Sequence, residues 1–416
     1  MPEWIEYSLN ELLSYEQPTQ YIVESTDYND AYDTPVLTAG KSFILGYTDE
    51  KGGIYDQLPV IIFDDFTTAS QYVNFKFKVK SSAMKILTPE KELVLPKYIY
   101  YRMQIINFDH STHKRYWIQE YSKIKVSIPP LPEQERIVAR IEELFSQLDA
   151  GVETLKKAKA QLAVYRQAVL KEAFEGKLTA EWRKSHYSDI EKILGEINKA
   201  SGKTKEYHLE YDIPLSELPK EWKWVFIGNI SKGTEYGTAQ KSLKQGKVPV
   251  LRMGNMQNGI IDWNDLAYSN DDEEIKKYRL KRGDVLFNRT NSPEHVGKTS
   301  IYRGEREAIF AGYLIRINQF DCINPEYLTY YMNSFTAKNY GNKVKTDGVN
   351  QSNINGTKLC SYPFPLCSTE EQVQVVYELE TRLSVCDSIE KTVDSALRQA
   401  EAMRQSILKQ AFEGNL

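Results

Sequence analysis

Apolar residues recur every seven positions in two long stretches of the chain. The first stretch carries them at Ile141, Leu148, Leu155, Leu162 and Val169. The second carries them at Leu379, Val393 and Ile407, with Cys386 and Ala400 at the places between. A second set of seven-spaced positions runs beside each, and includes Tyr165, Ile389 and Met403. Such spacing is typical of helices that pack along a common seam. The pattern predicts two long helices packed against each other.

These stretches are copies of one another. Residues 133–178 align without a gap to residues 371–416, and 18 of the 46 aligned positions are identical. Prolines precede the first copy and Ser368 precedes the second, which favours a helix start at both places. Gly176 and Gly414 favour a helix end. A helix of roughly 40 residues is about 60 Å long, so each copy is longer than a small domain is wide.

The segments before each helix alternate short strand-like runs with turn residues. Strands are predicted at 59–63, 73–79, 248–251 and 284–287, and helices at 97–106 and 325–336. We therefore expect an α+β protein. The expected boundaries are 1–132 for a first mixed α/β domain, 133–178 for the first long helix, 179–217 for a polar connection, 218–370 for a second mixed domain and 371–416 for the second long helix.

Composition and charge narrow the class. With 416 residues, 41% of them hydrophobic and 26% charged, the chain is expected to fold as a globular protein of more than one domain. No apolar stretch is long enough to span a membrane, and the N-terminus does not resemble a secretion signal, so we expect a cytoplasmic protein. The four cysteines form no C-x-x-C pair and are expected to be free thiols.

The net charge of −4 hides a local asymmetry. Residues 1–75 carry a charge of −11, whereas residues 76–125 carry +7. Lysines and arginines also cluster between residues 276 and 282 and between 338 and 345. Such basic patches are compatible with two interpretations, a surface that binds nucleic acid and an ordinary solvated surface.

The usual catalytic templates are missing from the sequence. The run 295–300 imitates the end of a phosphate-binding loop, but Ser292 stands where the loop needs its first glycine. Only His110 and His113 are close enough in sequence to share a site, and their loop favours polar contacts over a metal. We expect no catalytic residue and no metal site in this chain, so any chemistry belongs to a separate subunit.

Three motifs stand at the borders of the long helices: Pro129-Pro130-Leu131-Pro132-Glu133-Gln134, the run from Val169 to Leu178, and the run from Ile407 to Gly414. These motifs resemble those of one family, the specificity subunits of type I restriction-modification enzymes. The start of the second helix departs from the pattern, because Cys367-Ser368-Thr369-Glu370 lacks the second proline. The resemblance covers the whole chain. It implies two target-recognition domains separated by two antiparallel coiled-coil helices with pseudo-twofold symmetry.

The resemblance also implies partners and cofactors. Modification (methylase) subunits dock around the helices, and a restriction subunit supplies the nuclease and translocase. S-adenosylmethionine, ATP and magnesium are expected only in those partner subunits, and no cofactor is expected in this chain. Each recognition domain is expected to read one half of a double-stranded DNA target.

The DNA-binding candidates are basic or amide side chains, because these types contact phosphates and base edges. In the first domain they are Lys76, Lys78, Lys80, Lys85, Lys114 and Arg115. In the second domain they are Arg252, Asn255, Asn288, Arg289, Lys298, Lys343, Lys345, Asn350 and Gln351. The alternative is a coiled-coil structural adaptor, or a non-catalytic regulator, that binds protein partners and reads no DNA.

Overall fold

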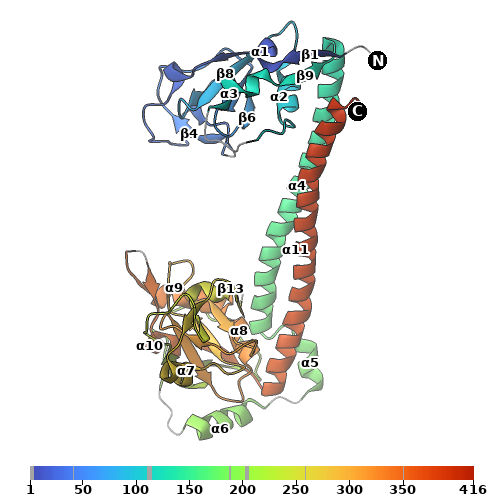
Figure 1. Ribbon diagram of the computed structural model, residues 1–416. Coiled ribbons are helices and arrows are strands. Elements are labelled where there is room, and N and C mark those ends of the chain that lie inside the picture. The colour runs from blue at the N-terminus through green and yellow to red at the C-terminus, as the bar shows by residue number, and fades with distance from the viewer. Residues whose placement is uncertain are drawn as a thin grey trace. The chain divides into compact units, whose positions relative to one another are not determined.

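The computed structural model describes residues 4–40, 42–109, 115–186, 189–201, 206–257, 259–349 and 351–416. The chain forms two compact units. The first unit contains Met1–Lys157 and Val393–Leu416, and the second contains Ala158–Thr392. Two helices of 44 residues, α4 (Leu131–Phe174) and α11 (Thr369–Phe412), each contribute one part to either unit (Figure 1).

The α/β part of the first unit, called the first head, contains three small sheets. The four-stranded antiparallel sheet has the order β2 (Leu13–Glu16), β8 (Met84–Pro89), β5 (Val60–Asp64), β6 (Ser70–Val73). The three-stranded sheet has the order β4 (Ile44–Thr48), β3 (Thr34–Leu37), β7 (Lys78–Val79), and β1 (Ile5–Ser8) pairs with β9 (Lys125–Ile128). The helices are α1 (Leu9–Leu12), α2 (Pro96–Met103) and α3 (Tyr116–Gln119), with 3-10 turns at Thr19–Tyr21 and Tyr121–Lys123.

The strand β5 is buried on both faces, which explains its uninterrupted apolar sequence. Ile61 and Phe63 belong to the core cluster that includes α2 and the long helices. Val60 and Ile62, on the opposite face, belong to the cluster of the three-stranded sheet.

The second head, the α/β part of the second unit, repeats this strand order. Its four-stranded sheet is β11 (Ser231–Tyr236), β20 (Leu314–Gln319), β16 (Val285–Asn288), β18 (Thr299–Ile301), and its three-stranded sheet is β15 (Ala267–Ser269), β12 (Val248–Leu251), β19 (Ile309–Phe310). The strand β10 (Lys223–Phe226) pairs with β23 (Pro363–Leu366). In both three-stranded sheets the central strand has one antiparallel and one parallel neighbour. The heads therefore share one topology, although their interiors have little sequence in common.

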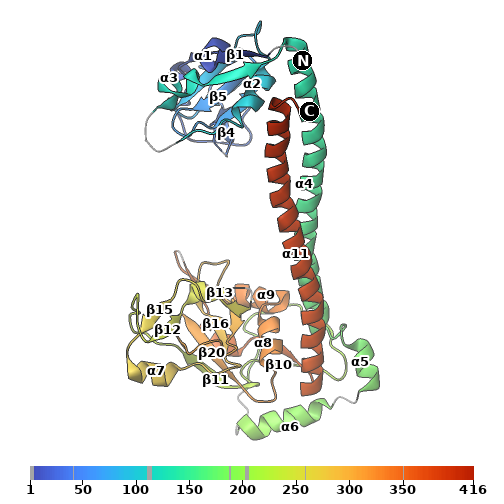
Figure 2. The same cartoon turned by 45° about the vertical axis from the view of Figure 1, so that its right-hand side comes forward.

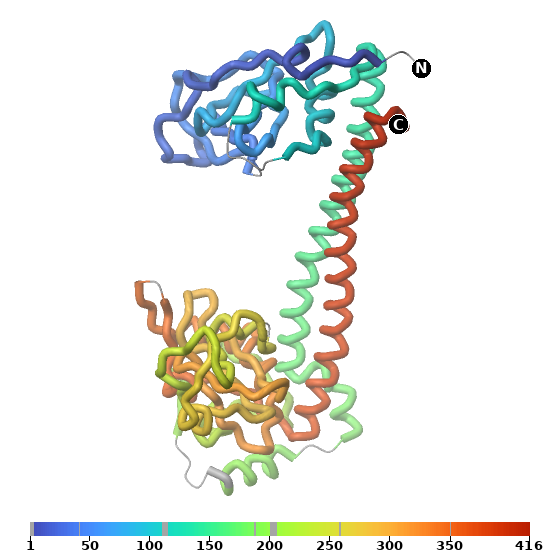
Figure 3. Tube along the Cα trace, viewed as in Figure 1, coloured from blue at the N-terminus to red at the C-terminus, as the bar shows by residue number. Residues whose placement is uncertain are grey.

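The second head also has elements of its own. Two short strands, β13 (Met256–Gln257) and β14 (Ile260–Ile261), form a hairpin, and β17 (Thr290–Asn291), β22 (Ser352–Asn353) and β21 (Thr346–Asp347) form an extra sheet. Its helices are α7 (Asp272–Tyr278), α8 (Pro325–Met332), α9 (Phe335–Val344) and α10 (Gly356–Cys360), with a 3-10 turn at Met253–Asn255. The β21–β22 hairpin projects from the body of this head in the Cα trace (Figure 3).

A buried glutamine fastens each head to the long helix that follows it. The side chain of Gln134 accepts a hydrogen bond from the Leu95 N–H at 2.8 Å and donates to the carbonyls of Leu93 and Pro129, both at 2.9 Å. Leu95 is the residue that caps the N-terminus of α2. The glutamine satisfies three backbone groups that would otherwise be buried without a partner.

Gln372 repeats this arrangement in the second unit. It accepts from the N–H of Asn324, which caps α8, at 2.8 Å. It donates to the carbonyls of Cys322 at 3.3 Å and Cys367 at 3.0 Å. Both glutamines are fully buried. The Glu-Gln pair that opens each repeated stretch is therefore a joint between head and helix.

The far end of the other long helix closes each joint. Phe412, near the end of α11, packs edge-on against Tyr98 of α2 with ring centroids 5.2 Å apart. Phe174, at the end of α4, packs in the same manner against Tyr327 of α8, also at 5.2 Å. Figure 2 shows α8 between the sheet of the second head and α11. Each head is thus held by the start of one long helix and the end of the other.

The helix ends follow the sequence prediction. The Ser368 hydroxyl accepts from the Glu371 N–H at 3.3 Å, which caps the start of α11. Gly176 and Gly414 have φ of +70° and +77°, a left-handed conformation that favours glycine. The next residue in each case bonds back to a carbonyl five residues earlier, at 2.9 Å, as in a Schellman motif.

Some predicted elements need correction. The run 73–79 is not one strand, because residues 74–77 separate β6 from β7. The predicted polar connection 179–217 contains two helices, α5 (Ala180–Ser185) and α6 (Ile190–Ser201). Ile193 and Ile197 of α6 are buried in the core of the second head, so this segment is part of the domain rather than a simple tether. All four cysteines are free, as predicted. Among the described residues, no helix is long and apolar enough to cross a membrane.

Candidate nucleic-acid interface

The extra sheet of the second head brings several predicted DNA-binding residues to one edge. Arg289 immediately precedes β17, Lys298 lies between β17 and β18, and Gln351 lies in the β21–β22 hairpin. Lys343 is on the last turn of α9, and Lys345 follows that helix. The Lys345 ammonium lies 3.5 Å from the Pro293 carbonyl and 3.6 Å from an oxygen of Asp347, which connects the hairpin to the loop before β18. Asn350 lies outside the described residues.

Arg289 is held in a fixed orientation on this edge. Its guanidinium lies over the Tyr236 ring, 4.9 Å from the centroid, and one nitrogen donates to the Asn353 side chain at 3.3 Å. The backbone of Arg289 is fixed as well, since its N–H donates to Tyr313 and its carbonyl accepts from Ile354. An arginine ordered by stacking loses little freedom when it hydrogen-bonds to a ligand. This geometry suits contact with a base edge or a phosphate.

The edge is predominantly positive. Its cations are Arg289, Lys298, Lys338, Lys343 and Lys345, and its carboxylates are Glu294 and Asp347. Lys338 of α9 belongs to the basic run 338–345 but is not among the DNA-binding residues that the sequence predicts. Lys298 lies on the same edge but is 40 residues away from Lys338 in sequence. Sequence spacing alone therefore could not predict that these two lysines lie near each other. A positive surface of this kind attracts polyanions.

The first head presents fewer of the predicted residues. Lys76 and Lys80 are exposed, and Lys76 makes only a loose contact with Asp56 at 3.8 Å. Arg115 is exposed and its guanidinium lies 5.9 Å from the centroid of Phe66, a phenylalanine that is 42% exposed in the β5–β6 turn. Lys114, with His110 and His113, lies outside the described residues. Arg115 and Phe66 form an exposed cation and aromatic pair.

Four of the predicted residues are instead interior groups. Lys78 is buried and bonds to Glu50 and to the Gly52 carbonyl, both at 2.7 Å. Lys85 is buried at 3.3 Å from Asp65. The Asn255 amide donates to two carbonyls of its own loop. Asn288 is fully buried in the four-stranded sheet. A buried side chain cannot reach DNA in this conformation, so we withdraw these four.

Arg252 is also engaged within its own loop. It donates to the carbonyl of Asp265 at 2.7 Å and pairs with the carboxylate of that residue at 3.3 Å. Its side chain is 37% exposed. Arg252 therefore shapes the loop before β15 and is a weaker candidate for DNA contact than Arg289.

The predicted seam of the long helices faces inward. Ile141, Val169, Leu379 and Val393 are buried, and Leu148, Leu155, Leu162 and Ile407 are partly buried. The second set of seven-spaced positions was partly wrong, because Tyr165, Ile389 and Met403 are 46%, 44% and 54% exposed. A straight helix drifts by about 20° per heptad, which turns a second stripe away from its neighbour.

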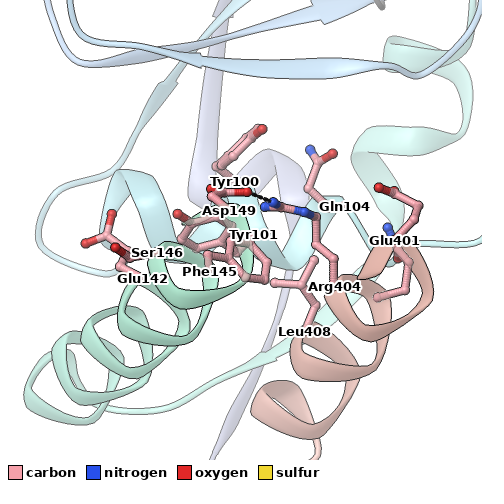
Figure 4. Close-up of a pocket in the computed structure, with 11 residues that line it drawn as sticks. Tyr100, Tyr101, Gln104, Glu142, Phe145, Ser146, Asp149, Glu401, Arg404 and Leu408 are labelled. Atoms are coloured by element: carbon pink, nitrogen blue, oxygen red, sulfur yellow. Dashed lines mark hydrogen bonds and ion pairs between the residues drawn. The ribbon is translucent and has the colours of Figure 1, made fainter. Parts of the chain in front are cut away.

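A repeated ion pair joins the long helices in each unit. In the first unit Arg404 pairs with Asp149 and lies over the Phe145 ring, 4.4 Å from the centroid. This arginine lines a groove of about 610 Å³. Tyr100 and Tyr101 of α2 line the same groove (Figure 4). In the second unit the pair is Arg166 with Asp387, at 2.6 Å. A second contact in each unit, Arg136 with the Leu416 carbonyl and Lys159 with Glu390, shows that the paired helix segments run antiparallel within that unit.

The functional contacts that sequence reasoning missed are the joints made by Gln134 and Gln372. Their identity in the repeat was visible, but their partners lie about 40 and 50 residues earlier in the chain, which no local pattern reveals. Burial of Tyr101 and Tyr330, next to each joint, raises the pKa of both phenols to about 12. These tyrosines are neutral at physiological pH.

Two copies of one α/β domain, each fixed by an equivalent joint to paired antiparallel helices, define a protein with two equivalent binding modules. The chain belongs to the type I restriction modification DNA specificity domain family, whose model matches residues 1–162 and 219–399. It is thus a specificity subunit and not an enzyme in its own right.

Related sequences agree with this assignment. The specificity subunit of the type I restriction enzyme EcoR124I/EcoR124II from Escherichia coli is 31% identical over 407 residues, which covers 93% of this chain and 88% of that protein. The EcoKI specificity subunit of Escherichia coli K12 is 30% identical over 301 residues, covering 71% of this chain and 58% of that protein.

Two solved structures have the same fold. The HsdS subunit from Thermoanaerobacter tengcongensis covers 100% of this chain and 98% of its own length, with a TM-score of 0.51 and 16% identity. A chain from a study of complex assembly and conformational transition of the type I R-M system covers 100% and 99%, with a TM-score of 0.69 and 16% identity. These likenesses support an α+β specificity-subunit fold.

Proposed function

We propose that this chain reads a two-part target in double-stranded DNA, one part with each head. The observation that carries the proposal is that the two heads share one strand order, while among the described residues the second head alone adds the sheet β17–β22–β21, from which its own basic residues project. A duplicated scaffold with unlike edges suits an asymmetric target, because each edge selects its own bases. The positive edge of the second head and the pair of Arg115 and Phe66 in the first are the proposed contact surfaces.

We further propose that α4 and α11 form an antiparallel coiled coil with pseudo-twofold symmetry and serve as a docking surface for modification subunits. Support comes from the duplicated joints and ion pairs, and from apolar side chains on the outer faces of the helices. On α11, within the second unit, Val373 is 54% exposed, Tyr377 is 62% exposed and Val385 is 56% exposed. Exposed apolar residues along one element are typical of a surface that a partner covers.

The remaining parts of the proposal concern the complex. A restriction subunit is proposed to join the modification subunits, and S-adenosylmethionine, ATP and magnesium are proposed to bind to those partners rather than to this chain. The cytoplasmic location expected from the sequence is part of the same proposal. A purely structural adaptor is not favoured, because the family to which the chain belongs is defined by DNA specificity.

The experiment that tests the proposal exchanges one head. Residues 218–365 are replaced by the matching segment of another family member, and the methylated motif is mapped in cells that carry the chain with its modification subunits. We expect one half of the motif to change and the other to stay. A change in both halves would show that the heads share one recognition surface. Salt-independent binding, or no binding, of duplex DNA by the wild-type complex would contradict DNA reading itself.

A further inference from the structure

A small cavity opens on the positive edge of the second head, between α9 and the loop that precedes β18. Its volume is about 180 Å³. The loop contributes Glu294 and Lys298 among others, α9 contributes Lys338 and Gly341, and Tyr362, which lies between α10 and β23, completes the wall. Gly341 allows the close approach of Tyr362, since a Cβ at that position would lie 2.6 Å from the tyrosine hydroxyl. Gly341 and Tyr362 are therefore closely packed in the wall of the cavity.

Two lysines line this cavity, and neither has a carboxylate partner among the residues that the structure describes. The Lys298 ammonium donates to the Gln257 side chain at 3.2 Å, a neutral group. Within the part of the chain that the structure describes, the ammonium group of Lys338 makes no hydrogen bond and no ion pair, whereas its backbone N–H donates to the Ser334 carbonyl. Crowding around its ammonium group, and then the positive charge of Lys298, lower the pKa of Lys338, although the residue as a whole is exposed. Two cations that face one space repel each other unless an anion lies between them.

Glu294, the acidic residue among the described residues of the wall, does not neutralise them. The Glu294 carboxylate accepts hydrogen bonds from its own backbone N–H and from Ser292, which lower its pKa, with smaller effects from His295 and Lys345. It is thus engaged within its own loop. The cavity keeps an excess of positive charge and has room for a group of the size of a phosphate.

We propose that Lys298 and Lys338 together bind one phosphate of the DNA strand that the second head reads. This inference rests on the proposed function and deepens it, because it assigns the contact that sets the register of this head on its half-site. Arg289 and the β21–β22 hairpin lie on the same edge and would meet the neighbouring bases. Phosphate contacts fix position, whereas base contacts carry the sequence information.

The test uses the full chain in complex with its modification subunits and a duplex that contains the methylated motif. The variants are Lys298→Gln, Lys338→Gln and the double variant, and Lys220→Gln is the control because its side chain is 90% exposed before β10. We expect each single variant to weaken binding by about fivefold to tenfold and the double variant to be little worse, since both lysines serve one phosphate. The slope of log Kd against log salt concentration should decrease by the amount that corresponds to about one phosphate contact. The methylated DNA motif should not change.

A second arm locates the phosphate. Duplexes carrying one neutral methylphosphonate at successive positions are bound to wild type and to the double variant. We expect one position in the second half-site to weaken binding by wild type and to leave binding by the double variant unaffected. If a methylphosphonate at no position weakens binding by the wild-type complex, the inference is wrong. This outcome is measured on the wild type alone, so it does not depend on whether a variant folds.

A third arm separates DNA from free phosphate. Inorganic phosphate is titrated into the complex by calorimetry. One outcome is that inorganic phosphate binds to the wild-type complex, that the variants abolish this binding, and that the variants still bind DNA as the control does. The cavity then binds a free anion, so this inference fails while the proposed function stands. If the wild-type complex shows no salt-dependent DNA binding at all, the proposed function fails, and this inference with it.

Discussion

Replacement of Gln134 by leucine should unfold the joint of the first unit and leave the second unit intact. The variant removes three hydrogen bonds of 2.8 to 2.9 Å and leaves one N–H and two carbonyls buried without this partner. Each unsatisfied buried group costs about 1–3 kcal/mol, and leucine regains part of this by apolar burial. We expect a net loss of about 3–5 kcal/mol in the free energy of unfolding of the first unit.

Gln372→Leu should do the same to the second unit, where the N–H of Asn324 loses its partner. Hydrogen exchange with mass spectrometry distinguishes the two, because peptides around Leu95 and Asn324 report on different units. Gln134→Leu should speed exchange only in the first peptide and Gln372→Leu only in the second. Urea unfolding followed by circular dichroism gives the loss in free energy.

The matched control is Gln167→Leu, which makes the same change at an exposed position of α4. It should alter stability by less than about 0.5 kcal/mol. If Gln134→Leu unfolds at the same urea concentration as this control and keeps its exchange protection, the glutamine joint contributes nothing and the reasoning is refuted.

Three further predictions follow from other contacts. Asp65→Ala leaves Lys85 buried without its counter-charge and should cost about 3–5 kcal/mol in urea unfolding, so a loss below about 1 kcal/mol would contradict a buried charge there. Arg289→Ala should relax one base position in a single half of the motif, as read by methylome mapping, and an unchanged motif would remove it from base reading. Deletion of 152–158 and 390–396 together shortens each helix by about 10 Å and keeps the seam in register. The preferred half-site spacing should then shorten by about 3 base pairs, and retention of the original spacing at full affinity would exclude the helices as its determinant.

Local periodicity predicted the long elements well because their order is set along the chain itself. The seven-residue repeat located α4 and α11 to within a few residues, and Gly176 and Gly414 marked their ends. The duplication of the heads was also visible, but only at their borders. Their common strand order depends on pairings such as Ile61 with Leu87, between residues that no sequence period connects.

The candidate site could be predicted only in part, because charge alone does not tell whether a side chain is exposed. Lys76 and Lys78 are two residues apart, yet one is exposed and the other is bound to Glu50, which lies in a distant turn. Lys85 is interior because β8 lies between β2 and β5, where Asp65 supplies its counter-charge. Lys338 gains its significance only from Lys298, which the fold brings near.

The division of the long helices between two units has a consequence for synthesis of the protein on the ribosome. The second unit is one continuous segment, Ala158–Thr392, whereas the first needs Val393–Leu416 as well. Arg136 and the Leu416 carbonyl, which bond in the first unit, are 280 residues apart in sequence. The first head leaves the ribosome before residues 393–416, the helix segment that completes its unit, have been synthesised. The whole second unit is synthesised in between, and contacts of such long range form slowly. Until α11 has been synthesised, Tyr98 and the core beside it lack the helix that covers them. The first head is therefore the part of the nascent chain most exposed to chaperones and proteases.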